Sequence, residues 1–283
     1  MTKNLFYLLP IFILLFSCRN SDNESDIKTE QEFLVKKISL TFIAVGHKNE
    51  TPSSENNIYY TFEYDSNNRL IKKIGMMLPM PSSTGYNNYY FSKDASTIIE
   101  YKGTSATLKD ISTDPKLMIP EYREDLILNN SNQIIEKNIL YKYSMTNKKT
   151  KYFYNGKLLI KRETTYPNMP YDPSESWDYI ETIVEDFTYD SNNNLQKIVT
   201  TSHKTGNVKS INKIKEITFG NYDTSKNPFV KLGILNDYFE RSLSKNNFRS
   251  RIETSYNIEG NPYKGSENTW NYSYDSNGNL ILE

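Results

Sequence analysis

Apolar and polar residues alternate along most of the chain, in short runs that are separated by Asn, Asp, Ser and Gly. In the last such run, Trp270, Tyr272 and Tyr274 fall on one face at a period of two, and Leu280 and Leu282 continue that face after a turn. A period of two is typical of a strand that is buried on one side. The pattern therefore predicts a β-hairpin with one apolar face.

One phrase recurs three times, as aromatic-x-Tyr-Asp-Ser-Asn-x-x-Leu, within residues 60–71, 187–198 and 272–282. Weaker copies cover residues 128–134 and 153–158. The turn residues favour a type I turn followed by an Asn or Gly with positive φ. The pair Asn155-Gly156 predicts a two-residue type I′ turn instead. Asp94, Asp223 and Asn257 are expected at intermediate turns, and the resulting interval of 26 to 35 residues suits two strands per unit.

These phrases resemble the YD-repeat proteins of the Rhs type, in which Tyr-Asp is followed by a short Gly or Asn turn and Leu. Residues 220–229 are similar to a segment in a family of uncharacterised Bacteroidota lipoproteins. There, a Tyr-Asp turn leads into Asn-Pro-Phe and a short helix. The resemblance implies a helix near 234–243 and no known chemistry. The side chains expected to face inward on that helix are Ile234, Leu235, Tyr238, Phe239 and Leu243.

The expected fold is therefore all-β, an antiparallel meander of repeated hairpins that forms one extended twisted sheet with a single short helix. Composition supports this expectation, because the chain contains 23 Tyr and 13 Phe but only three Ala, whereas helical proteins use Ala heavily. The 34 basic and 34 acidic residues balance. Without an excess of positive charge, nucleic acid is not an expected partner.

The N-terminus predicts export. Lys3 precedes an apolar run at residues 5–16, which is too short to span a bilayer and is typical of a signal peptide. The run ends at Leu15-Phe16-Ser17-Cys18, which resembles the lipobox of bacterial lipoproteins and implies lipid attachment at Cys18. The alternative is an ordinary signal peptide with an unrelated cysteine. The expected organisation is a signal peptide at 1–17, an acylated cysteine and flexible tether at 18–32, and a β domain at 33–283.

The tether carries an acidic cluster of Asp22, Glu24 and Asp26, which resembles the surface-export signals of Bacteroidota lipoproteins. We expect a protein anchored by its lipid to the outer membrane and displayed at the cell surface. Retention on the periplasmic face is the alternative.

The chain offers few residues for catalysis, and we nominate no metal site and no cofactor. The Asp-x-Asn turns at 65, 190 and 275 lack the bidentate Glu that closes an EF-hand loop, so they are read as turns. His47 and His203 are far apart in sequence and have no partner at metal-ligand spacing. The acidic group Glu181, Glu185 and Asp186 is the remaining route to an enzyme, because a glycosidase needs two carboxylates.

Aromatic residues offer a candidate binding loop. Tyr166, Tyr171, Trp177 and Tyr179 lie in a proline-rich segment that is predicted to be a long surface loop. Such a loop could contact a glycan or a protein partner, or it could cover the open end of the sheet. The predicted function is a lipid-anchored binding or scaffolding protein of the cell envelope without catalytic chemistry. The alternative is a glycan-processing hydrolase with paired carboxylates.

Overall fold

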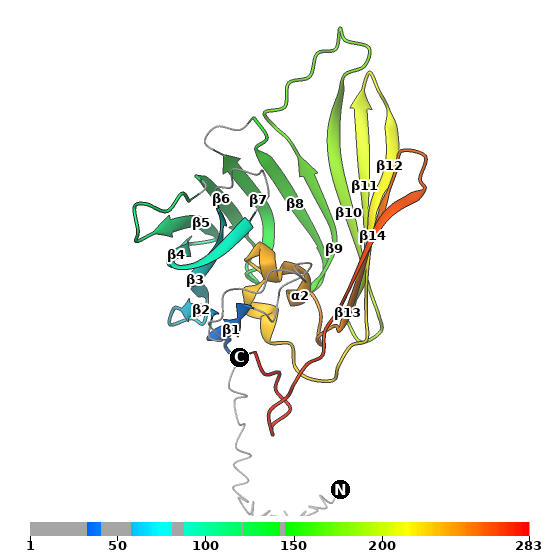
Figure 1. Ribbon diagram of the computed structural model, residues 1–283. Helices are drawn as coiled ribbons and strands as arrows, with labels where there is room; N and C mark the ends of the chain where they lie inside the picture. The colour runs from blue at the N-terminus through cyan, green and yellow to red at the C-terminus, as the bar shows by residue number, and fades with distance from the viewer. Residues whose placement is uncertain (1–32, 41–57, 81–87, 120, 142–144, 283) are drawn as a thin grey trace, which may run out of the picture. The chain divides into compact units, whose positions relative to one another are not determined.

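The protein is described by a computed structural model at residues 33–40, 58–80, 88–119, 121–141 and 145–282 (Figure 1). These residues form one antiparallel sheet of fourteen strands, in which each strand pairs with its neighbours in sequence and β1 and β14 are the edges. The predicted antiparallel meander is therefore confirmed. The strands are β1 (Lys37–Ser39), β2 (Tyr59–Tyr64), β3 (Leu70–Met80), β4 (Asn88–Lys102), β5 (Ser105–Ser112), β6 (Tyr122–Leu128), β7 (Ile134–Tyr141), β8 (Lys148–Asn155), β9 (Leu158–Thr165), β10 (Tyr179–Tyr189), β11 (Leu195–Gly206), β12 (Ser210–Gly220), β13 (Ser250–Tyr256) and β14 (Pro262–Thr269).

The repeated phrase forms the same turn at each of its three full copies. In the first, Oδ1 of Asp65 accepts hydrogen bonds from the backbone N–H groups of Asn67 and Arg69, both at 2.9 Å. The aspartates of the other two copies accept the equivalent pair of bonds. The fourth residue of each turn has positive φ, at 57° for Asn68, 64° for Asn193 and 78° for Gly278. This is the predicted geometry, in which a side-chain acceptor closes the turn.

Two turn predictions are wrong. Asn155 pairs with Leu158 as the last residue of β8, so the central pair of that turn is Gly156-Lys157. Only Gly156 has positive φ there, as in a type II′ rather than a type I′ turn. Asp94 lies inside β4, at an irregularity in its pairing with β3, and not between two strands.

Tyrosine hydroxyls connect consecutive repeats. Tyr154 donates to the carbonyl of Ile134 at 2.9 Å, and Tyr189 donates to the carbonyl of Leu159 at 3.0 Å. Tyr222 donates in the same way to Leu195. Each acceptor is the first or second residue of the second strand of the preceding hairpin. The recurring Tyr and Leu of the phrase are thus linked from one hairpin to the next.

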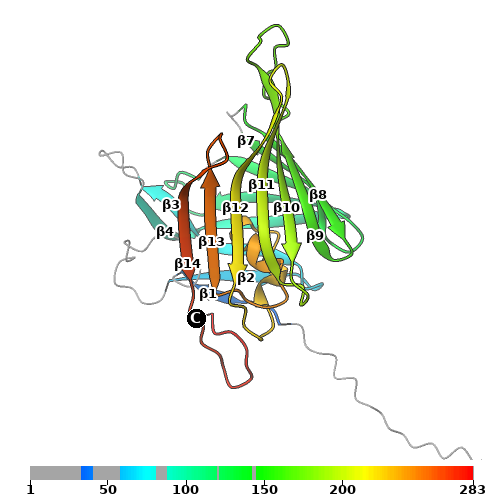
Figure 2. The ribbon, with the colours of Figure 1, turned by 90° about the vertical axis from the view of Figure 1, so that its right-hand side faces the viewer.

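A helical segment at residues 221–249 joins β12 to β13 and is drawn in gold between the strands of the sheet in Figures 1 and 2. It contains η1 (Pro228–Leu232), η2 (Asn236–Tyr238) and α2 (Phe239–Ser242), so the helix predicted near 234–243 is confirmed as two short elements. The side chains that were expected to face inward, Ile234, Leu235, Tyr238, Phe239 and Leu243, all belong to or pack against the core.

The helical segment packs on the inner face of the sheet. Tyr238 is 1% exposed and meets Phe62 of β2 edge to face, while the ring of Phe239 meets Tyr152 of β8 in the same manner. Strands that are remote in sequence therefore share one core with this segment.

Cys18, the predicted signal peptide and the predicted tether lie outside the described residues. The helices in the described part of the chain include none with the length and apolar character needed to cross a bilayer.

Candidate functional site

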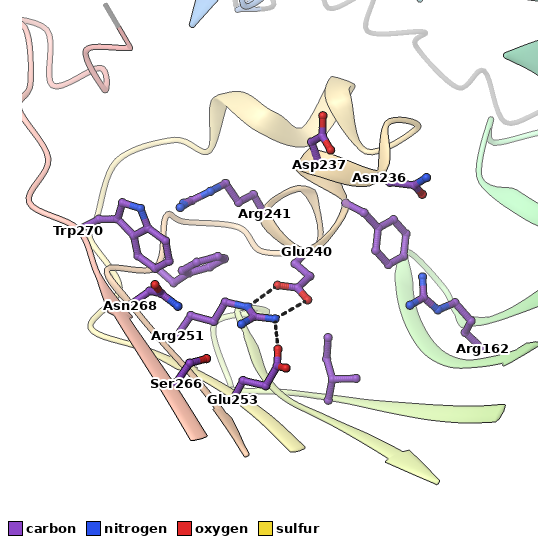
Figure 3. A pocket seen from close by; sticks show the side chains of 13 residues that line it. Arg162, Asn236, Asp237, Glu240, Arg241, Arg251, Glu253, Ser266, Asn268 and Trp270 are labelled. Carbon is purple, nitrogen blue, oxygen red and sulfur yellow. Dashed lines mark hydrogen bonds and ion pairs between the residues drawn. The ribbon is translucent and has the colours of Figure 1, made fainter. Parts of the chain in front are cut away.

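A pocket of about 560 Å³ lies between the helical segment and the inner face of the sheet (Figure 3). One wall comes from η2 and α2, and the facing wall comes from β13, β14 and Trp270, which follows β14. Arg162 of β9 and Ile198 of β11 complete it. Small-molecule sites in proteins have volumes in this range, ~300–1,000 Å³.

The edge strand β14 lines the pocket with a row of side chains at a period of two. Ser266, Asn268 and Trp270 all line the cavity, as Figure 3 shows. Ser266 and Asn268 make no side-chain hydrogen bond to any described residue, and Trp270 is half-buried. The row therefore offers a hydroxyl, an amide and an indole ring to a bound molecule.

The neighbouring strand β13 adds charge beside this row. Arg251, which pairs with Asn268 in register, donates through Nε to Glu240 of α2 at 2.8 Å and through Nη2 to Glu253 at 2.8 Å. Because Glu240 comes from α2 and Glu253 from β13, this arginine fastens the helical segment to the sheet. Two carboxylates share one guanidinium here, so oxygen acceptors remain on the pocket wall.

Arg162 is held differently. Its Nη2 donates to Oε1 of Glu185 at 2.7 Å and its Nε donates to the other carboxylate oxygen. Burial alone would lower the pKa of this guanidinium, but the hydrogen bonds and the charge of Glu185 outweigh burial and raise the pKa above its usual value. Arg162 and Glu185 therefore form a neutral pair at the back of the pocket.

Arg241 of α2 is 5% exposed and lies among aromatic rings, with its guanidinium carbon 4.5 Å from the ring centres of both Phe248 and Trp270. Its Nη1 donates to the Tyr272 hydroxyl at 2.7 Å. Its Nη2 is buried without a hydrogen-bond partner among the described residues. Cation–π contacts of this kind stabilise a desolvated guanidinium but supply no counter-charge.

A partly buried polar cluster lies under η2. Lys137 donates to Glu124 at 2.7 Å and to Asn236 at 2.9 Å, and Lys73 donates to Asp237 at 2.5 Å. Nearby, desolvation raises the pKa of Asp110, and the charge of Glu124 acts in the same direction. Asn236 and Asp237 of η2 also line the pocket. The cluster thus positions the helical segment against β3, β6 and β7.

The four aromatic residues of the predicted binding loop do not form one surface. Tyr171 packs against Gly206, whose φ of 103° and lack of a Cβ allow the ring to approach to 2.8 Å of where a Cβ would lie. Tyr179 lies under Lys204, with the ammonium 3.9 Å from its ring centre. Tyr166 is half-buried, and burial followed by the charges of two glutamates raises its pKa.

Trp177 is 68% exposed and is the one fully presented aromatic ring of the four. Its Nε1 donates to Glu175 at 2.9 Å. The loop beneath it is held by Asn207, whose amide donates to the carbonyls of Pro173 and Glu175 at 2.9 and 2.7 Å. The loop is therefore a fixed support for a single exposed indole ring.

Two of the three acidic residues considered for hydrolysis bind side chains of neighbouring strands. Glu185 is bound to Arg162, and Glu181 accepts a hydrogen bond from Ser202 at 2.5 Å. Both lie on the same face of β10, four residues apart, and each is held by a residue of a neighbouring strand. Asp186 points to the opposite face, as the alternation of the strand requires. His203 pairs with the Thr201 hydroxyl at 2.9 Å, and His47 lies outside the described residues.

The sequence identified Trp270 only as part of an apolar hairpin face, and it did not identify Ser266, Asn268, Arg241 or Arg251. The alternation along 266–270 was the one available signal, since it places the three side chains on one side of β14. Which face meets the helical segment depends on contacts between distant residues.

No protein-family model and no curated protein sequence matches the chain. Among solved structures, the chain is similar to a crystal structure described as a porin-like protein from Bacteroides uniformis, with 12% identity, a TM-score of 0.44, and coverage of 78% of this chain and 80% of that one. A second, described as a porin-like protein from Bacteroides vulgatus, has 14% identity and a TM-score of 0.47, with coverage of 88% and 90%.

Proposed function

We propose that the protein is a lipid-anchored saccharide-binding protein of the cell envelope, and that the pocket beneath the helical segment is its ligand site. The observation that carries this proposal is the row of Ser266, Asn268 and Trp270 along the inner face of β14. An indole ring offers a flat apolar surface with a polar edge, and a sugar ring has matching apolar faces and hydroxyl edges.

The surrounding charges support a polyhydroxylated ligand. Glu240 and Glu253 offer carboxylate oxygens that can accept hydrogen bonds from hydroxyl groups, while Ser266 and Asn268 can both donate and accept. The helical segment is held to the sheet by the ion pair of Arg251 with Glu240 and by the hydrogen bonds of Asn236 with Lys137 and Glu124. This preorganisation lowers the entropy lost when a ligand is bound.

Calorimetric titration of the purified protein with a panel of neutral and acidic disaccharides tests this proposal. We expect saturable binding of at least one disaccharide and loss of about tenfold or more in affinity for Asn268→Ala. The matched control is Asn271→Ala, because Asn271 is exposed and does not line the pocket. No binding to any disaccharide by a folded protein would refute the proposal.

Anchoring at Cys18 and display at the cell surface belong to the same proposal and rest on the apolar run that ends at Ser17-Cys18. A fatty-acid probe should label the wild-type protein and leave Cys18→Ser unlabelled. Equal labelling of both proteins would remove the anchor from the proposal. Protease treatment of intact cells tests the location: a protein displayed at the cell surface should be digested, whereas a protein on the periplasmic face should be protected.

Glycan processing is the alternative function, and a pair of carboxylates at Asp110 and Glu124 could support it. Asp110 and Glu124 lie on adjacent strands, and desolvation raises the pKa of Asp110, with the charge of Glu124 acting in the same direction. Glu124 is 3% exposed and accepts a hydrogen bond from Asn236 of η2 at 2.9 Å. Release of reducing ends from a disaccharide by wild type, but not by Asp110→Asn, would favour the enzyme over the binding protein.

A further inference from the structure

We infer that Arg241 makes the pocket selective for saccharides that carry a carboxylate, such as uronic acids. This inference rests on the proposed function and specifies its ligand class. It is drawn from the way the three arginines of the pocket wall are partnered.

Two of those arginines are neutralised by the protein itself. Arg162 is paired with Glu185, and Arg251 is shared by Glu240 and Glu253. Arg241 differs, because it makes no ion pair with any described residue, although only 5% of it is exposed. A buried charge without a counter-ion is unfavourable, so an anion that enters the pocket would be stabilised at this position.

The free hydrogen-bonding capacity of Arg241 matches a carboxylate. Nη1 donates to the Tyr272 hydroxyl, and Nη2 has no hydrogen-bond partner in the described part of the chain. Arginine binds carboxylates through two parallel N–H groups, and such charge-assisted bonds are stronger than bonds between neutral groups. Phe248 and Trp270 hold the guanidinium through ring contacts, which impose less direction than hydrogen bonds do. Nη2 is buried, so the guanidinium must turn within these rings to present it to the pocket.

Trp270 places the expected site of the sugar ring beside the expected site of its carboxylate. Its ring lines the pocket and also contacts the Arg241 guanidinium. A sugar ring against this indole would have its edge beside Arg241. A uronic acid carries its carboxylate at that edge, directly bonded to the ring, so one compact ligand can satisfy both residues.

Arg249 provides a matched control. It donates through Nη2 to the hydroxyl of Tyr274 at 2.9 Å and has a buried Nε without a hydrogen-bond partner among the described residues, yet it does not line the pocket. A purely structural role in holding the tyrosines of the last hairpin would make the two arginines equivalent. Selectivity for an acidic ligand would distinguish them.

The experiment compares digalacturonate with its methyl ester, in which each carboxylate is replaced by an uncharged ester group, by calorimetry on the wild-type protein. We expect the acid to bind about tenfold more tightly than the ester. This difference should disappear in Arg241→Met, persist in part in Arg241→Lys, and remain unchanged in Arg249→Met.

The outcomes separate the inference from the proposed function. Equal affinity of wild type for the acid and the ester would overturn the role of Arg241 and leave saccharide binding standing. Failure of the protein to bind these ligands or any neutral disaccharide would refute the proposed function. Because the wild-type comparison needs no substitution, it decides the question even if Arg241→Met does not fold. Loss of selectivity in Arg249→Met as well would assign the effect to the hairpin and contradict the inference.

Discussion

The two tryptophans of the chain occupy regions that are built in different ways. Trp177 stands on a loop whose hydrogen bonds are mostly to its own residues and to the adjacent turn at Asn207. Trp270 lies against α2 and β13, and the walls of its pocket come from segments that span residues 162–270. Local sequence is therefore enough to place an aromatic ring on the surface. A pocket that combines an aromatic ring with polar side chains able to bind a ligand requires contacts between strands that are far apart in sequence.

Two aspartates show the same difference in electrostatic terms. Desolvation raises the pKa of Asp110 under the helical segment, whereas hydrogen bonds from Ser174 lower the pKa of Asp172 in the exposed loop. One carboxyl is partly desolvated, and the other is exposed to water and held by a turn. The pocket region therefore depends on buried polar groups that the loop does not contain.

The largest effect is expected from breaking the packing of the helical segment. Tyr238 stacks on Phe229 with ring centres 6.1 Å apart and is 1% exposed, so Tyr238→Ala should lower the free energy of unfolding by about 3–5 kcal/mol. Urea denaturation measures this loss. Val230→Ala, at a 56% exposed position of the same segment, should change stability by less than about 0.5 kcal/mol. Equal stability of the two variants would show that the segment does not build the core.

A smaller effect is expected at the turn of the last hairpin, which follows Trp270. Gly278 has a φ of 78° and open space around it, so Gly278→Val introduces backbone strain without a clash and should cost about 1–2 kcal/mol in unfolding free energy. Gly265→Val is the control, since Gly265 is not at positive φ. Thermal melts measure both. A chelator that lowers the melting temperature of wild type would show instead that the Asp-x-Asn turns bind ions.

The pH dependence of stability should separate the two aspartates. The folded-state pKa of Asp110 is raised, so between about pH 4 and that raised value the native protein binds more protons than the unfolded chain does. The stability that Asp110 contributes by binding this proton is therefore present at low pH and is lost as the pH rises. For Asp172, with a lowered pKa, the contribution is present above about pH 4 and is lost as the pH falls. Urea unfolding of Asp110→Asn and Asp172→Asn across this range should show changes in slope of opposite sign. Changes of the same sign in the two variants would contradict the opposite pKa directions of Asp110 and Asp172.

The smallest effect on stability is expected from Trp177→Ala. The side chain is 68% exposed and its hydrogen bond to Glu175 is at the surface, so the free energy of unfolding should change by less than about 0.5 kcal/mol. A fall of about 3 kcal/mol would show that the ring covers the sheet as a structural element. If the stability is unchanged, Trp177 remains available as a contact for a protein partner.

The sequence predicted the elements that are determined locally. Asp65 and Asn68 define their turn through bonds that span four residues, and the same chemistry recurs in each copy, so the meander could be predicted from one phrase. The short helix was predicted from its resemblance to a known segment. The misassigned Asp94 has the same residue type as a turn aspartate, but pairing with β3 and β5 keeps it within a strand.

The candidate site could be predicted only in part. The prolines beside Trp177 predicted an exposed loop, but the roles of Tyr171 and Tyr179 depend on Gly206 and Lys204 of β11, which no local pattern reveals. The pocket could not be predicted because the helical segment is fastened by ion pairs between residues far apart in sequence, as in the contact of Lys73 with Asp237.

The central claim is that saccharides bind beside Trp270 and not beside Trp177, and the fluorescence of single-tryptophan proteins tests it most directly. The chain has two tryptophans, so Trp177→Phe leaves Trp270 as the sole indole emitter and Trp270→Phe leaves Trp177. Titration with digalacturonate should change the emission of Trp177→Phe in a saturable manner and leave the emission of Trp270→Phe constant. A saturable change in Trp270→Phe, with no change in Trp177→Phe, would contradict the account and place the ligand on the loop.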